Sequence, residues 1–179
     1  MRIFLVISFL LGTVFFSTSQ TEIKSTNTDI IIKASFIYNF AKHSKWPDSE
    51  AEGQKFRIAV FGDKSVYEEL IDKYSTRAIQ FNQIIEVVWI TDASELEDIQ
   101  VVYIARNKSD ALTDISLMAQ VQNILVISDF EPIDSQIGSI SFTVVDNTIS
   151  FNVNKTQAEK CGVQLGNRII DWANKIIEK

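Results

Sequence analysis

The chain of 179 residues is poor in the side chains that build most enzyme sites: it has one histidine, one cysteine, six glycines and two prolines. The single histidine, His43, excludes sites with several histidine ligands, and the single cysteine, Cys161, excludes a CxxC pair and a disulfide framework within the chain. The spacing of the glycines excludes the phosphate-binding patterns GxGxxG and GxxxxGK[ST]. The sequence therefore predicts no metal, no cofactor and no enzyme.

The charge balance is acidic, with 23 Asp and Glu against 17 Lys and Arg, a net charge of -6. This balance argues against a nucleic-acid partner, because nucleic-acid binders need a basic face to neutralise phosphates. Hydrophobic residues make up 46% of the chain and charged residues 22%, the composition of a globular protein. The length is that of one domain.

The N-terminus has the pattern of a secretory signal peptide. A basic residue, Arg2, precedes an uncharged apolar run over residues 3–16, and small residues prepare a cut after Ser19. The run is shorter than the roughly 20 residues that span a bilayer, so cleavage is favoured over a membrane anchor. We predict a signal peptide at 1–19, a flexible polar tail at 20–28 and a single domain at 29–179, exported and without membrane insertion after cleavage.

Short runs rich in isoleucine and valine alternate with helical patterns in the first two thirds of the predicted domain. Such runs are typical of strands that are buried on both faces of a parallel sheet. The predicted strands cover residues 56–61, 84–90, 101–105 and 124–127. Predicted capping boxes at Ser65 with Glu68 and at Ser94 with Glu97 mark a helix and a helical turn, and residues 109–120 predict another helix.

The pattern changes to strict alternation after Gly138. Apolar residues alternate with polar ones on both sides of Asp146–Asn147, which predicts a β-hairpin with one apolar face. A short helix capped by Asn154 follows, and an apolar period over residues 165–176 predicts a final helix. We therefore expect a three-layer α/β fold: a mostly parallel sheet flanked by helices, with a C-terminal β-hairpin and a closing helix.

The first predicted helix, from Asp29 to the Trp46–Pro47 step, carries two apolar stripes. One stripe contains Ile30, Ala34, Ile37, Tyr38 and Ala41, and the other contains Ile32, Phe36 and Phe40. A surface helix needs only one, so the second stripe packs on the closing helix, on a second copy or on a partner. Trp46 either anchors the helix end in the core or lines a groove. Ile32, Phe36, Phe40 and Trp46 are therefore the candidate partner-binding residues.

Five segments of the chain resemble the YfiR/HmsC-like family of secreted regulators, also called the DUF4154 family. The segment KASFIYNFAKHSKWP at 33–47 is similar to the family's first-helix motif, and FRIAVFGD at 56–63 to its first strand and turn. DIQVVYIARNKS at 98–109 resembles its middle strand, and GSISFTVVDNTISFNVN at 138–154 its hairpin. Residues Ala158, Gly162, Leu165, Arg168 and Trp172 stand where the closing helices of the family fall.

The resemblance implies a periplasmic, non-enzymatic inhibitor that binds the sensor region of an inner-membrane signalling protein. The partner is a diguanylate cyclase, with output through cyclic di-GMP and biofilm behaviour, or another sensor such as a histidine kinase. Paired cysteines found in some members are missing, so Cys161 is a buried thiol or pairs between chains in a homodimer. The alternative function is a periplasmic small-ligand binding module that uses a groove at the carboxyl ends of the strands.

Overall fold

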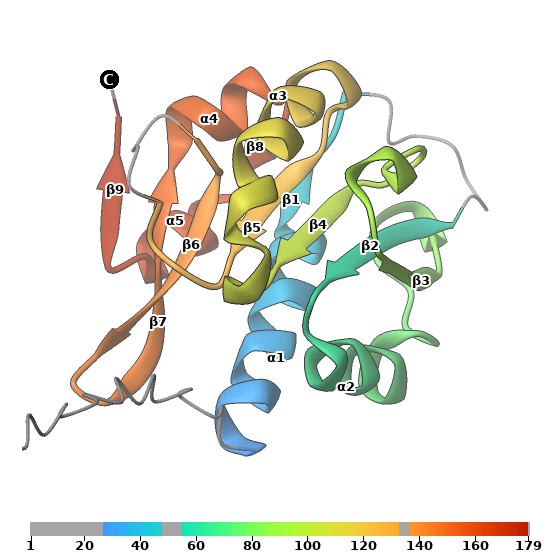
Figure 1. Ribbon diagram of the computed structural model, residues 1–179, viewed down its shortest axis with the longest axis horizontal. Coiled ribbons are helices and arrows are strands. Elements are labelled where there is room, and N and C mark those ends of the chain that lie inside the picture. The colour runs from blue at the N-terminus through green and yellow to red at the C-terminus, as the bar shows by residue number, and fades with distance from the viewer. Residues whose placement is uncertain (1–26, 48–54, 133–136, 179) are drawn as a thin grey trace, which may run out of the picture.

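The computed structural model describes residues 27–47, 55–132 and 137–178. Within them, strands and helices alternate along the chain and then give way to a β-hairpin and a C-terminal strand (Figure 1). The predicted signal peptide at 1–19 lies outside the described residues. Most of the predicted tail at 20–28 does so too, and its last two residues belong to the first helix.

Seven strands form one sheet in the order β3-β2-β4-β5-β6-β7-β9. All neighbouring strands run parallel except β6 and β7, which form an antiparallel hairpin. A separate antiparallel pair joins β1 (Ser44–Lys45) to β8 (Gln164–Leu165). The predicted α/β fold with a mostly parallel sheet is confirmed. The strands of the large sheet are β2 (Phe56–Phe61), β3 (Ile85–Ile90), β4 (Val101–Ile104), β5 (Leu125–Ser128), β6 (Ile140–Val145), β7 (Thr148–Asn154) and β9 (Lys175–Ile177).

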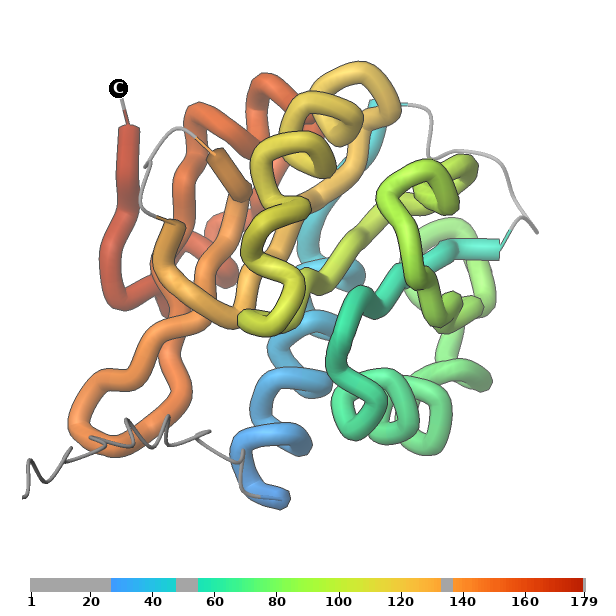
Figure 2. Tube along the Cα trace, in the orientation of Figure 1, coloured from blue at the N-terminus to red at the C-terminus, as the bar shows by residue number. Residues whose placement is uncertain are grey.

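Helices cover both faces of this sheet (Figure 2). The longest, α1, lies across one face with α2 beside it, and α3 lies on the other face next to β5. The α-helices are α1 (Asn27–His43), α2 (Lys64–Tyr74), α3 (Leu112–Gln122), α4 (Lys155–Lys160) and α5 (Asn167–Trp172), and the 3-10 helices are Gln80–Asn82, Ala93–Glu95 and Arg106–Ala111.

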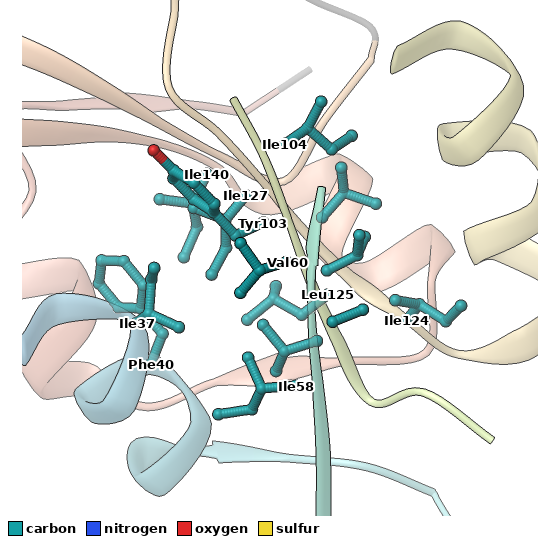
Figure 3. Close-up of a cluster of buried hydrophobic side chains, with 14 of the residues drawn as sticks. Ile37, Phe40, Ile58, Val60, Tyr103, Ile104, Ile124, Leu125, Ile127 and Ile140 are labelled. Carbon is teal, nitrogen blue, oxygen red and sulfur yellow. The ribbon is translucent and has the colours of Figure 1, made fainter. Parts of the chain in front are cut away.

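The main core lies between α1 and the sheet. Ile37 and Phe40 of α1 point at a row of side chains from neighbouring strands, among them Ile58, Val60 and Tyr103 (Figure 3). The alternation of side chains places these strand residues on one face, because Ile58 pairs with Val101 and Val60 with Tyr103. Burial of this apolar surface at about 25 cal/mol per Å² is the main force that holds α1 on the sheet.

Both predicted capping boxes are wrong in detail. Asp63 caps α2 in place of Ser65, accepting hydrogen bonds from the main-chain N–H groups of Ser65 and Val66. The second capping box is Asp92 with Glu95, two residues before the predicted pair. In both turns an aspartate is available earlier in the chain, and a carboxylate is as good an N-cap as a serine hydroxyl.

The predicted closing helix is present as α5, but it is shorter than the predicted 165–176 because it stops at Trp172. Ala173 has extended backbone angles, and the chain continues as β9, which pairs in parallel with β7. A main-chain hydrogen bond from Asn174 N–H to the carbonyl of Phe151 starts this pairing. Completion of the sheet edge therefore overrides the helical period of the last residues.

Candidate functional site

A groove of about 380 Å³ opens at the carboxyl ends of the strands, between the N-terminal half of α1 and the hairpin. It lies beside the ends of β4 and β5, where α/β sheets commonly place their sites. Charged groups form one part of its wall and apolar hairpin residues the other. The lining residues are Asp29, Lys33, Arg106, Asp129, Glu131, Phe142, Thr143, Val144 and Ile149.

The usual ligand position of such a sheet, between β2 and β4, is filled in this protein. Gly62 follows β2 with a φ of 95°, and a Cβ there would lie 2.5 Å from Asn107 Oδ1. The side-chain amide of Asn107 donates to the Gly62 carbonyl, and Lys108 Nζ stands 4.8 Å from the centre of the Phe61 ring. The expected groove at the strand ends is therefore displaced towards β5 and β6.

An ion pair at the base of the groove ties α1 to the sheet. Lys33 Nζ lies 2.7 Å from Asp129 Oδ1, and the two side chains are only 6% and 17% exposed. The guanidinium of Arg106 donates to the main-chain carbonyl of Asp129 at 3.1 Å, which holds the end of β5 in position. Such a buried pair costs desolvation and is strongly destabilising to break, because the remaining charge is left uncompensated.

Tyr103 lies under this pair, on the face of β4 that α1 covers. Its side chain is fully buried, and its hydroxyl makes no hydrogen bond of normal geometry in the part of the chain that the structure describes. Burial raises the pKa of Tyr103 well above its ordinary value, and the carboxylates of Asp129 and Asp63 raise it further. The hydroxyl therefore stays protonated and is available as a donor near Asp129.

The four candidate partner-binding residues divide into two groups. Phe40 and Trp46 are buried, at 1% and 8% exposed, whereas Ile32 and Phe36 are half-buried. Phe40 packs edge-on against Phe151 of the hairpin, with the ring centroids 4.7 Å apart. Trp46 packs edge-on against Phe56, with the ring centroids 5.0 Å apart. Phe40 and Trp46 therefore pack in the core, and contact of these two with a partner stays a prediction.

The second stripe of α1 packs on the hairpin rather than on the closing helix. The ring of Phe36 stacks on that of Phe40, with centroids 5.9 Å apart. Its centroid also lies 5.0 Å from that of Phe151 and 6.2 Å from that of Phe142. The hairpin supplies these aromatic partners because its apolar face turns towards α1. Ile32, one turn earlier, and Phe36 are half-buried, so contact with a partner stays a prediction for these two as well.

The pKa shifts of four residues outside the groove have local structural causes. The carboxylates of Asp92 and Glu95 accept hydrogen bonds within their turn from Ser94 and Thr91, which lower the pKa of both groups. Partial burial, then the charges of Arg168 and Lys42, lowers the pKa of His43. Cys161 is a buried free thiol, and burial raises its pKa to about 11.

Two features of this site could not be predicted from patterns in the sequence. The approach of Lys33 to Asp129 joins segments far apart in the chain, and neither residue stands in a motif that would pair them. Tyr103 carries no local signal that its hydroxyl lies near carboxylates from two other strand ends. The only signal at Lys33 is its position at the start of the first-helix motif.

Comparison with known proteins gives a family. Residues 31–174 match the family model described as YfiR/HmsC-like (DUF4154). No protein of curated function matches the chain. In the described residues, no helix is both long and apolar enough to cross a membrane.

Proposed function

The chain belongs to the YfiR/HmsC-like family, and from this we propose that it binds the periplasmic sensor region of an inner-membrane signalling protein and holds that protein inactive. The family is one of periplasmic regulators of cyclic di-GMP signalling. The partner is a diguanylate cyclase or another sensor, such as a histidine kinase. The single observation that supports the proposal is the match of the family model over residues 31–174.

The surface around the groove supports this assignment. Val144 at the hairpin is 63% exposed, and Ile32 and Phe36 of α1 are half-buried. Exposed apolar residues that gather at one place are typical of contact surfaces. We assign the partner surface to this end of α1 and the hairpin.

Inhibition follows from differential affinity. A binder that prefers the inactive state of the sensor shifts the equilibrium towards that state, and a shift from 1:99 to 99:1 needs about a 10⁴-fold preference. No chemical step by the regulator is needed, so we propose that the protein is not an enzyme. A second signal then releases the sensor by weakening this preference.

The test is co-purification and crosslinking of residues 20–179 with candidate inner-membrane sensors. We expect Ile32→Ser and Val144→Ser to weaken capture. Leu117→Ser, at an exposed position of α3 on the other face of the sheet, should leave capture unchanged. Capture that is equal for all three variants would argue against this surface. Capture of no sensor by the wild-type chain would argue against the function itself.

The second candidate function is a periplasmic small-ligand binding module, and the groove favours it. The groove combines an apolar wall at Phe142 and Val144 with buried polar groups of Lys33 and Asp129, as ligand sites do. Mass spectrometry of the protein released from its native host distinguishes the two functions. A stoichiometric small molecule that leaves when Val144 is changed to Glu would favour the ligand module.

A further inference from the structure

Among the residues that the structure describes, no segment pairs with the last part of the β6 edge that faces the groove. β5 pairs with β6 only at Ile127↔Ile140 and Ser128↔Ser141, whereas β6 continues to Val145. Its last residues therefore pair with β7 alone, and the hairpin extends beyond the neighbouring strands (Figure 1). The groove lies where a longer β5 would run, between this edge and α1.

The main-chain groups of Val144 face this open edge. The turn at Asp146–Asn147 has two residues, both with positive φ, 47° and 60°, as in a type I′ hairpin. The residues that flank such a turn, Val145 and Thr148, form a hydrogen-bonded pair. The direction of the main-chain groups alternates along a strand, so the N–H and C=O of Val144 point away from β7.

This edge also lacks the features that normally block strand addition. Natural sheet edges carry lysine, proline, a bulge or a very short strand. The two outer strands of this sheet follow that rule: β9 has three residues and carries Lys175, and β3 carries Glu86, which pairs with Lys55 and Arg57. The segment Phe-Thr-Val-Val at 142–145 has none of these features, and its register with β7 is unbroken.

Here we infer that the proposed sensor partner docks by β-strand addition: an extended segment of the sensor pairs with the β6 edge at 142–145 and fills the groove against α1. This inference rests on the proposed function and names how the partner is recognised. Main-chain hydrogen bonds supply the affinity in this mode, and pockets for alternate side chains supply the specificity.

The two faces of the groove define the chemistry of the occupant. On the α1 side an added strand meets Phe142, Val144 and Ile149, which accept apolar side chains. On the opposite side it meets Thr143, and Arg106 and Glu131 lie along the same groove. The occupant is therefore a segment of about four residues or more that alternates apolar and polar side chains.

The test compares variants at one position, using the complete mature chain and the sensor domain that co-purifies with it. Val144→Pro removes the outward N–H and keeps the pairing with β7, because proline is tolerated where a strand N–H points to an open edge. We expect at least about tenfold weaker binding, from one lost hydrogen bond plus the clash of the ring with an added strand. Val144→Thr keeps the N–H and the branched shape, so it should bind the sensor more tightly than Val144→Pro does.

Amide hydrogen exchange by NMR gives a readout that does not depend on a variant. Sensor binding should slow exchange of the Val144 amide at least about tenfold and leave the Val145 amide, already bonded to β7, unchanged. If Val144→Pro unfolds the hairpin, this measurement on the wild-type chain alone decides the question.

Each of the remaining results leads to a different conclusion. If the sensor binds the wild-type chain but neither protects the Val144 amide nor distinguishes the two variants, strand addition is overturned and the proposed function stands. If protection appears with rising concentration of the chain alone, the occupant is a second copy and the inference is overturned. If no sensor binds, the proposed function and the inference fall together.

Discussion

Replacement of Lys33 by methionine should lower the free energy of unfolding by about 3 kcal/mol, and the buried ion pair is the reason. The Lys33 side chain is 6% exposed and its Nζ lies 2.7 Å from Asp129, which is 17% exposed. Methionine fills a similar volume, so the cavity cost is small and the uncompensated carboxylate dominates. Partial exposure of Asp129 places the expected loss at the lower end of the usual 3–5 kcal/mol.

Urea unfolding at pH 7 measures this loss. With a slope of about 2 kcal/mol per molar urea, the midpoint should fall by about 1.5 M. The double variant Lys33→Met with Asp129→Asn should recover more than half of the loss, because no charge is then left buried. Lys64→Met is the matched control: its partner Glu68 lies 3.6 Å away in an exposed pair, and the expected change is below about 0.5 kcal/mol. A loss below 1 kcal/mol for Lys33→Met, or no recovery in the double variant, would refute the reasoning.

Four further predictions concern three single positions. Because burial raises the pKa of Cys161 to about 11, its thiol should resist alkylation at pH 8 until urea unfolds the chain; fast labelling of the native protein would contradict this. Tyr103→Phe should change stability by less than about 1 kcal/mol at pH 7, since the hydroxyl makes no hydrogen bond of normal geometry within the described residues; a larger loss would show a bonded hydroxyl. The raised pKa of Tyr103 also means that stability falls above about pH 10, where tyrosine in the unfolded chain ionises, and Tyr103→Phe should reduce that fall in urea titrations at pH 9 to 11. Gly62→Ala should cost at least about 1 kcal/mol in thermal unfolding, because φ is 95° and the new Cβ meets Asn107 and Lys108. The double variant with Asn107→Ala should recover only part of the steric cost, and full recovery would contradict the role of φ.

Local pattern was sufficient for the strands and the hairpin. The isoleucine- and valine-rich runs became β2, β3, β4 and β5, and the alternation around Asp146–Asn147 became β6 and β7. These signals are strong because a buried strand needs apolar residues on both faces and a two-residue turn needs residues that accept positive φ. Helix ends were less certain, because aspartate and serine compete as caps within two residues of each other.

The candidate site shows where such reasoning stops. The periodicity of α1 gave two apolar stripes correctly, but not their neighbours: Phe36 and Phe40 pack on Phe142 and Phe151 of a hairpin that lies more than a hundred residues later in the chain. The burial of Trp46 against Phe56 was one of two readings that the sequence allowed. An apolar stripe indicates that another segment packs on that face of the helix. Which segment packs there depends on the topology of the fold.

The sequence by itself determined the class of the protein: few residues for catalysis, a leader pattern, an α/β order of elements and the motifs of one family. The tertiary structure alone decided the pairing of Lys33 with Asp129, the conversion of the last residues from helix to β9, and the open edge at Val144. The physical reason is that propensity and periodicity act over a few residues. Ion pairs, sheet edges and grooves, in contrast, depend on which distant segments the fold brings into contact.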